Sequence, residues 1–146
     1  MRWTEEKANE WQKKTGWLFG FNYVVSTAVN STEMSDIITY HDYNPLESSV
    51  EKINNLKKYN RPILCTEWLF REGGNTFESH LPLYKENISG AYNWGLIKGR
   101  TQTNLHWGSK LNDAEPEIWQ HDLFYPDGKP YSKAEIEFIK NYQKLD

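Results

Sequence analysis

The sequence has one cysteine, a small net charge and no long apolar run, and each of these shortages excludes a class of protein. Cys65 cannot form an internal disulfide, and no Cys and His residues have metal-ligand spacing, so we expect no metal and no cofactor. The formal charge of −3 gives no electrostatic reason to bind nucleic acid or an anionic membrane. No stretch resembles a signal peptide or a membrane span. As the chain stands we expect a cytoplasmic protein, or a secreted or periplasmic one if a leader has been lost.

Aromatic side chains are abundant instead, with seven Trp and nine Tyr among 146 residues. They can fill an aromatic core, or they can form flat apolar platforms that suit the CH faces of sugar rings. A chain of this length can build one domain with a sizeable core. We find no internal repeat and no boundary, so residues 1–146 are expected to form a single domain.

Apolar periodicity predicts strands and helices that alternate along the chain. Helices are predicted between Thr4 and Gly16, at 46–59, around 77–84 and from Ser132 onward, and strands within 17–25, 36–41, 61–70 and 90–97. Such alternation implies parallel strands joined by helical crossovers. The ten residues between Val25 and Asp36 are an exception, because they are too few and too irregular for a crossover helix.

The run from Arg61 to Phe70 is the most informative of these strands. Because side chains alternate along a strand, Ile63, Cys65 and Glu67 should share one face. A carboxylate on an apolar face is costly unless it is paired or open to a cavity. Glu67 is therefore either a solvated residue at the strand end or a functional group.

Ligands of parallel α/β proteins bind at the carboxyl ends of the strands. The four predicted ends carry Asn22 and Tyr23, His41 to Tyr43, Glu67 with Trp68, and Asn93 with Trp94. Taken singly, His41 is more often structural, and Tyr43 and Trp94 are more often core residues. At equivalent strand ends they together favour a site for a polar, ring-shaped substrate, with Glu67 as its best nucleophile.

These strand ends resemble the second half of a clan A glycoside hydrolase, a (β/α)8 barrel of the cellulase and mannanase type. The residues that carry the resemblance are His41-x-Tyr43, Glu67 in Ile-Leu-Cys-Thr-Glu-Trp, and Trp94 in Asn-Trp-Gly. Family 5-like bacterial enzymes labelled cellulase or 1,4-β-xylanase are the most similar. Residues 3–34 and 121–131 resemble the start and the end of the same proteins.

The resemblance implies a role for each of these residues. Glu67 would be the nucleophile that closes strand seven, and Tyr43 would hydrogen-bond it. His41 would line the donor-sugar site, and Trp94 would be the sugar platform after strand eight. From their strand-end positions we add Asn22 and Trp68 as substrate-binding residues.

The resemblance also implies that part of the barrel is missing. Residues up to about Met34 match strand one and those from Ser35 match the approach to strand six, so strands two to five have no counterpart. The family's substrate-binding Arg and acid/base Glu are missing with them. A complete barrel needs at least about 200 residues. We therefore expect an α/β fold, a partial (β/α)8 (TIM-type) barrel with about four parallel strands and flanking helices.

A retaining glycosidase needs a second carboxyl group about 5 to 5.5 Å from its nucleophile. Asp42, Glu72, Asp113 and Glu115 are candidates, but none stands at the family position. We expect a protein similar to a retaining glycoside hydrolase of β-linked polysaccharides or oligosaccharides, weak or inactive for lack of its acid. The alternatives are a non-catalytic carbohydrate-binding protein and a half-barrel that forms a homodimer through its open sheet edges.

Overall fold

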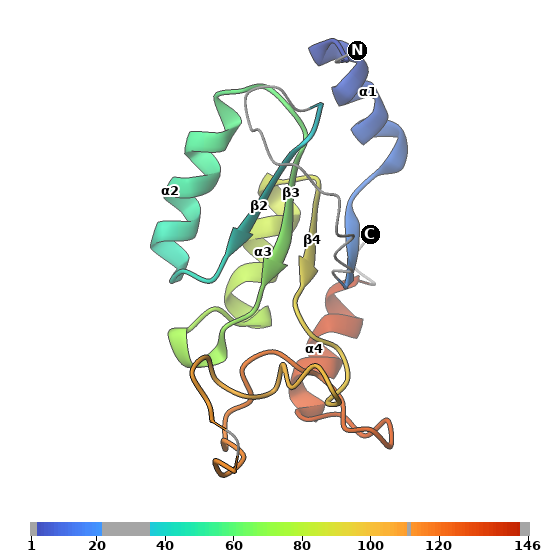
Figure 1. Ribbon diagram of the computed structural model, residues 1–146. Coiled ribbons are helices and arrows are strands. Elements are labelled where there is room, and N and C mark those ends of the chain that lie inside the picture. The colour runs from blue at the N-terminus through green and yellow to red at the C-terminus, as the bar shows by residue number, and fades with distance from the viewer. Residues whose placement is uncertain (1–2, 22–35, 111, 144–146) are drawn as a thin grey trace.

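The structure, a computed structural model, describes residues 3–21, 36–110 and 112–143 (Figure 1). Its helices are α1 (Glu5–Thr15), α2 (Leu46–Lys57), α3 (Phe77–Asn87) and α4 (Lys133–Gln143), with a short 3-10 helix, η1 (Arg71–Gly73). Its strands are β1 (Leu18–Phe21), β2 (Ile38–Asp42), β3 (Ile63–Trp68) and β4 (Gly90–Asn93). The predicted alternation of strands and helices is thus present in the described residues.

The four strands form one sheet in which every pairing is parallel. The order is β1-β4-β3-β2, so the first two strands along the chain lie at opposite edges. Strands six, seven, eight and one of a closed eight-stranded barrel are neighbours in the same order. The prediction of an α/β fold with about four parallel strands and flanking helices is confirmed. The loop 26–35, where we predicted no crossover helix, lies outside the described residues.

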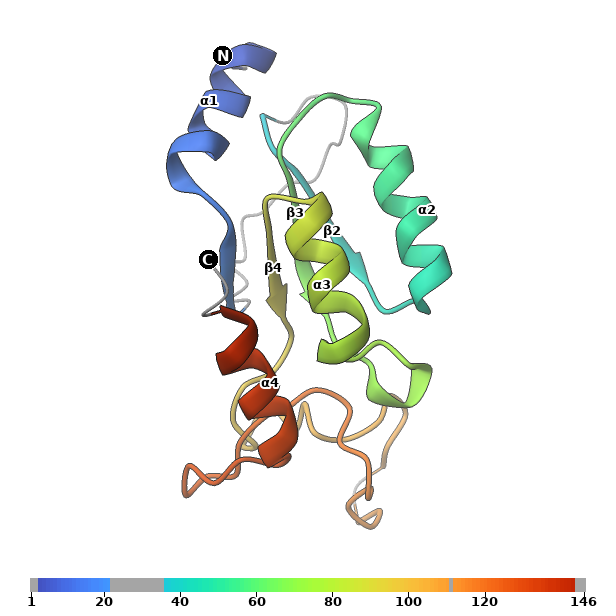
Figure 2. The ribbon, with the colours of Figure 1, turned by 180° about the vertical axis from the view of Figure 1, so that it is seen from behind.

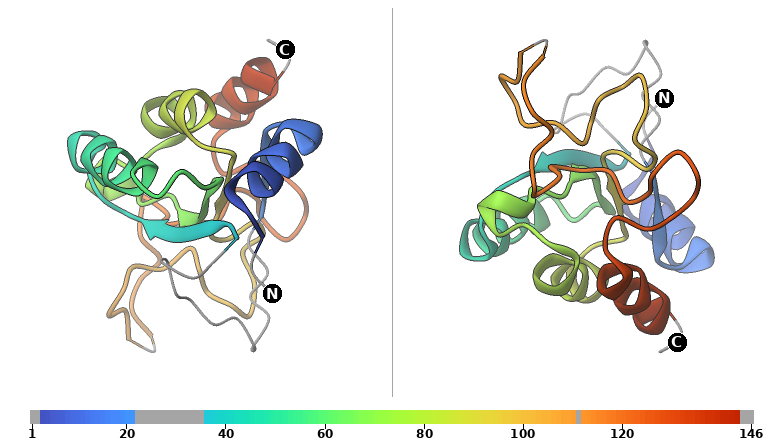
Figure 3. Two further views of the ribbon diagram at one scale, coloured as in Figure 1. Left: turned by 90° about the horizontal axis from the view of Figure 1, so that it is seen from above. Right: turned by 90° about the horizontal axis from the view of Figure 1, so that it is seen from below.

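Helices α2, α3 and α4 lie on one side of the sheet (Figure 2). Seen along the strands, the four helices form an arc around it, as the outer helices of a barrel do (Figure 3). The irregular segment between β4 and α4 crosses the carboxyl ends of the strands, below the arrowheads in Figure 1. Any site at those ends is therefore built partly by this segment.

The core fills the space between the sheet and the helices. Its buried members include Ile38, Ile53, Ile63, Cys65, Trp68, Phe77, Leu81 and Tyr84. Full burial of one large apolar side chain contributes roughly 1.5–3 kcal/mol, so this cluster holds α2 and α3 against β2 and β3. Among the described residues, no helix has the length and apolar character needed to cross a membrane.

Candidate functional site

An irregularity in β3 sets the direction of Glu67. Tyr40 of β2 lies opposite Cys65, but the next residue, His41, lies opposite Glu67, so β3 carries one extra residue at this point. Such a bulge changes the face on which the following side chains lie. Cys65 and Trp68 are both fully buried in the core, and Glu67 instead directs its carboxylate to β2. The prediction that Glu67 shares a face with Cys65 is therefore wrong, because it assumed unbroken alternation.

Two donors from β2 and its exit converge on one oxygen of Glu67. The Tyr43 hydroxyl donates to Oε2 at 3.0 Å, and His41 Nδ1 lies 2.9 Å from the same atom. The Glu67 side chain is 15% exposed, and that of His41 is 50% exposed. Burial and the neighbouring Glu67 carboxylate raise the pKa of Tyr43, so the phenol keeps its proton and remains a donor. The carboxylate is thus held in a fixed orientation at the carboxyl end of a strand.

The other predicted site residues have different positions. Trp68 is fully buried, and its ring lies edge-on to the rings of Phe77 and Tyr84, with centroids 5.0 and 5.1 Å away. The prediction that Trp68 binds substrate is corrected accordingly, since a bulge before it turns its side chain into the core. Trp94 is partly buried. Its backbone N–H donates to the backbone carbonyl of Trp68 at 3.1 Å, which fixes the end of β4 beside β3. Asn22 lies outside the described residues.

The reasoning from sequence missed Trp107, in the segment that crosses the strand ends. Its ring meets the Tyr43 ring edge-on, with 5.0 Å between centroids and 87° between planes. It also lies 5.0 Å from the ring of Phe70 and 5.8 Å from that of His121. No periodic pattern marks residues 98–131, so the only signal for Trp107 was the abundance of Trp itself.

Asp42, one of the candidates for a second carboxyl group, faces the helices. Its carboxylate is fully buried and accepts from the Asn44 side chain at 2.7 Å, from Lys52 at 3.5 Å and from Tyr84 at 3.4 Å. Lys52 balances the charge of the carboxylate, and the hydrogen bonds occupy both of its oxygens on the core side of the sheet. Asp42 is therefore a structural carboxylate that ties β2 to α2 and α3.

The other three candidate carboxylates lie outside the core. Asp113 accepts from the Lys110 N–H, and Glu115 pairs with Lys98, both on exposed loops. Glu72 is 44% exposed and lies 3.3 Å from His106 Nδ1, while His106 Nε2 donates to the Ile118 carbonyl. Because His106 precedes Trp107 in the chain, Glu72 is the one of these three that contacts a sequence neighbour of Trp107.

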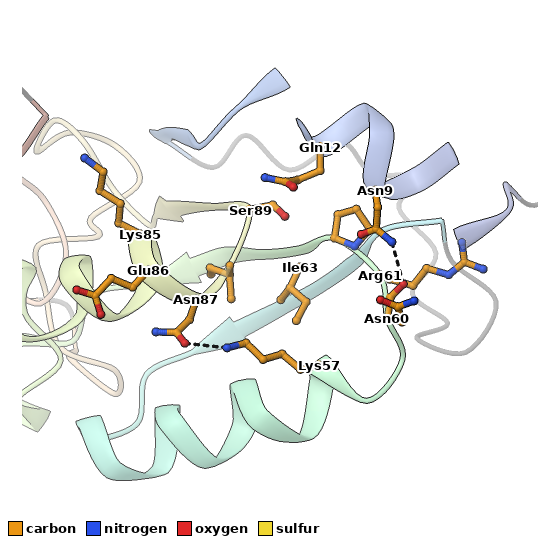
Figure 4. Close-up of a pocket in the computed structure, with 12 residues that line it drawn as sticks. Asn9, Gln12, Lys57, Asn60, Arg61, Ile63, Lys85, Glu86, Asn87 and Ser89 are labelled. Carbon is orange, nitrogen blue, oxygen red and sulfur yellow. Dashed lines mark hydrogen bonds between the residues drawn. The ribbon is translucent and has the colours of Figure 1, made fainter. Parts of the chain in front are cut away.

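A separate polar hollow of about 380 Å³ lies at the opposite end of the sheet (Figure 4). Residues of α1, the end of α2, the start of β3 and the end of α3 line it. Lys57 donates to Asn87 at 2.7 Å, and Asn9 donates to the Asn60 carbonyl at 3.3 Å across its floor. It opens at the amino ends of the strands, away from Glu67, whereas parallel barrels bind ligands at the carboxyl ends.

No family model and no curated protein matches the sequence. Seven solved chains match the structure, and one is a β-glucuronidase of an uncultured Clostridium species, with a TM-score of 0.50 and 12% identity. The match covers 77% of this chain and 24% of that one.

The fold is that of part of a TIM barrel. The β-glucuronidase is a TIM-barrel glycosidase, and this chain spans about a quarter of its length. The likeness at this identity concerns the fold alone. The resemblance to family 5 finds support neither among family models nor among curated proteins.

Proposed function

We propose that this protein acts on or binds β-linked carbohydrate at the carboxyl ends of its strands, with Glu67 as the nucleophile of a retaining glycosidase-type reaction. The observation that carries the proposal is the Glu67 carboxylate, oriented by Tyr43 and His41 at the end of a parallel strand. The fold shared with a β-glucuronidase supports the reaction class. Trp94, at the end of the adjacent strand, is proposed as a sugar platform of the same site.

The chemistry that these residues can perform follows from their charges. The Glu67 carboxylate attacks the anomeric carbon, the glycosidic bond breaks with its electron pair going to the leaving oxygen, and a glycosyl ester forms. Hydrogen bonds from Tyr43 and His41 hold the carboxylate in place for this attack. Water then hydrolyses the ester and returns the free carboxylate.

Turnover of natural glycosides is expected to be slow, because the leaving oxygen needs a proton. General acid assistance is worth roughly 10² to 10⁴ in rate. Among the described candidates, Asp42 is engaged in the core and Asp113 and Glu115 lie on outer loops. Glu72, beside His106, is the remaining carboxyl group to test as a proton source.

The test compares an activated glycoside with an unactivated one. Dinitrophenyl β-glycosides of glucose, xylose, mannose and glucuronic acid need little acid assistance, whereas the matching oligosaccharides need it fully. We expect dinitrophenol release by the native protein, loss of release in Glu67→Gln, and little oligosaccharide cleavage by either. Glu51→Gln, on the exposed side of α2, is the matched control and should keep the native rate.

Other outcomes have defined meanings. Efficient oligosaccharide cleavage would show that another carboxyl group supplies the proton, and Glu72→Gln would then be examined. Equal release by the native protein and Glu67→Gln would refute the nucleophile. Protein that is folded by circular dichroism yet inert towards every substrate would favour the second candidate, a non-catalytic carbohydrate-binding protein. The exposed ring of Trp107 supports this second candidate.

The open edges of the sheet support a further proposal about assembly. β1 and β2 are the outer strands of the sheet formed by the described residues, and each offers a backbone edge for pairing. Two copies joined edge to edge would place eight strands side by side. Sedimentation velocity of the native chain tests this proposal: a dimer supports it, and a monomer at all concentrations opposes it.

A further inference from the structure

Trp107 stands at the corner of a tight turn that presents its side chain to solvent. The Ser109 N–H donates to the His106 carbonyl at 3.1 Å, which closes a four-residue turn with Trp107 at its second position. Gly108, at the third position, has φ of +88°, as a type II turn requires. The Trp107 side chain is 61% exposed, the largest value among the large apolar residues that the structure leaves exposed.

The exposed ring is nevertheless held firmly from below. Tyr43 meets it edge-on, and Phe70 and His121 contact it from two other elements. Offset and edge-to-face aromatic pairs of this kind are favourable beyond the area that they bury. One face of the indole can therefore remain open while the rings of Tyr43 and Phe70, which follow β2 and β3, and the ring of His121 fix its position.

A chain of hydrogen bonds fixes the backbone beneath the ring. The backbone N–H of Trp107 donates to Gln120 Oε1 at 2.9 Å, and Gln120 Nε2 donates to His121 Nε2 at 3.1 Å. His121 Nδ1 in turn donates to the Leu69 carbonyl, just after β3. Gln120 is fully buried and His121 nearly so. The turn is thus anchored to the strand that carries Glu67, and a ligand that binds it need not order it first.

The surroundings of the ring indicate what it binds. Tyr43 contacts the Trp107 ring through its own ring and donates its hydroxyl to Glu67, so one side chain separates the indole from the carboxylate. The half-exposed His41 contacts the same Glu67 carboxylate, and His106, which precedes Trp107 in the chain, pairs with Glu72. Protein interfaces present a contiguous apolar patch, whereas a single flat ring among hydrogen-bonding groups matches a sugar, with its apolar CH face and polar rim.

We propose that Trp107 is the platform of a sugar-binding subsite next to Glu67, on which one ring of a β-linked oligosaccharide stacks. The proposal rests on the proposed function for its ligand class and assigns to this turn a binding role that the strand-end pattern did not predict. Binding and turnover are separate measurements, so the two proposals can fail independently.

The experiment measures binding of β-1,4-linked tetrasaccharides of glucose, xylose and mannose by isothermal titration calorimetry. Trp107→Leu keeps an apolar side chain against Tyr43 and Phe70 but lacks a flat ring, and Trp107→Phe keeps a ring. Tyr59→Ala is the matched control, because Tyr59 is another exposed aromatic residue, 42% exposed, just beyond α2 at the opposite end of the sheet. Thermal unfolding of each variant establishes that it is folded.

For the tetrasaccharide that the native chain binds best, we expect Kd to rise at least tenfold in Trp107→Leu and less than threefold in Trp107→Phe and Tyr59→Ala. An unchanged Kd in Trp107→Leu overturns the subsite, as does a native chain that binds none of the three sugars. Loss of binding in Tyr59→Ala equal to that in Trp107→Leu also overturns it. Dinitrophenyl glycoside release by the native protein is scored separately, and its absence counts against Glu67 as nucleophile rather than against Trp107.

Discussion

Acid should destabilise this protein through His121 well before its ordinary carboxylates are protonated. His121 is 2% exposed, and its burial lowers the pKa from the ordinary value of 6.5 to about 4, an effect that the nearby Arg71 charge reinforces and the hydrogen bond to the Leu69 carbonyl opposes. The imidazole is neutral in the folded state, with Nδ1 donating to Leu69 and Nε2 accepting from Gln120. A second proton on Nε2 would face the amide N–H₂ of Gln120.

The sign and size follow from proton linkage. Between pH 6.5 and pH 4 the unfolded state binds the His121 proton and the folded state does not, so the free energy of unfolding falls as the pH falls. One pKa unit corresponds to about 1.36 kcal/mol, and the shift therefore amounts to about 3 kcal/mol over this window. The contribution is complete above pH 6.5 and absent below pH 4.

The assay is urea unfolding followed by fluorescence at half-unit intervals from pH 4 to pH 7.5. His121→Asn keeps a side-chain N–H for the Leu69 carbonyl but does not titrate, so subtraction of its curve removes the contributions of His80 and Asp122, whose pKa values burial also shifts. We expect the native curve to lose about 3 kcal/mol more than the variant curve on acidification. Parallel curves would refute a buried, neutral His121.

Three further outcomes can be checked directly. Tyr43→Phe removes a hydrogen bond to the Glu67 carboxylate, and a hydrogen bond to a charged group is worth about 1.5–3 kcal/mol. The value of kcat/KM for a dinitrophenyl glycoside should therefore fall roughly 10- to 100-fold. An unchanged rate would contradict the role given to Tyr43. Glu135→Gln breaks a buried bidentate pair with Arg71, at 2.7 and 2.8 Å, and should lower the free energy of unfolding by about 3–5 kcal/mol, while the exposed Glu137→Gln on the same helix should not. Burial raises the pKa of the Cys65 thiol to about 12, so iodoacetamide at pH 8 should label the protein only after unfolding in urea, and rapid labelling of the native chain would show that this strand is not in the core.

Local patterns in the sequence were sufficient to predict the main helices and strands and to predict which residues lie at the carboxyl edge of the sheet. Parallel strands have their carboxyl ends at one edge, and this rule alone placed His41, Tyr43 and Glu67 at one edge of the sheet, where the structure brings them within hydrogen-bond distance. Helix α2 begins and ends close to its predicted limits, because five apolar residues recur there at helical spacing.

Features set by pairing between distant residues could not be obtained in the same way. The bulge in β3 exists only relative to β2, so alternation alone assigned Glu67 to the face of Cys65 and left Trp68 at the site. Trp107 lies 64 residues from Tyr43 in the chain and contacts it in a turn that buried Gln120 and His121, still further along the chain, anchor to Leu69. Neither contact leaves a periodic trace in the sequence.

A partial barrel is enough to hold the proposed nucleophile in a fixed orientation. The donors to Glu67 come from β2 and the residue just beyond it, and the strand that carries Glu67 is flanked by β2 and β4. Orientation of the carboxylate therefore needs only neighbouring strands, all of them in the described sheet. Delivery of a proton to a leaving group needs a carboxyl group across the sugar from the proposed nucleophile, and none of the four described strands has been given that role. Under the proposed function, rates on activated and unactivated glycosides thus report on two separable parts of the site, the oriented carboxylate and the proton source.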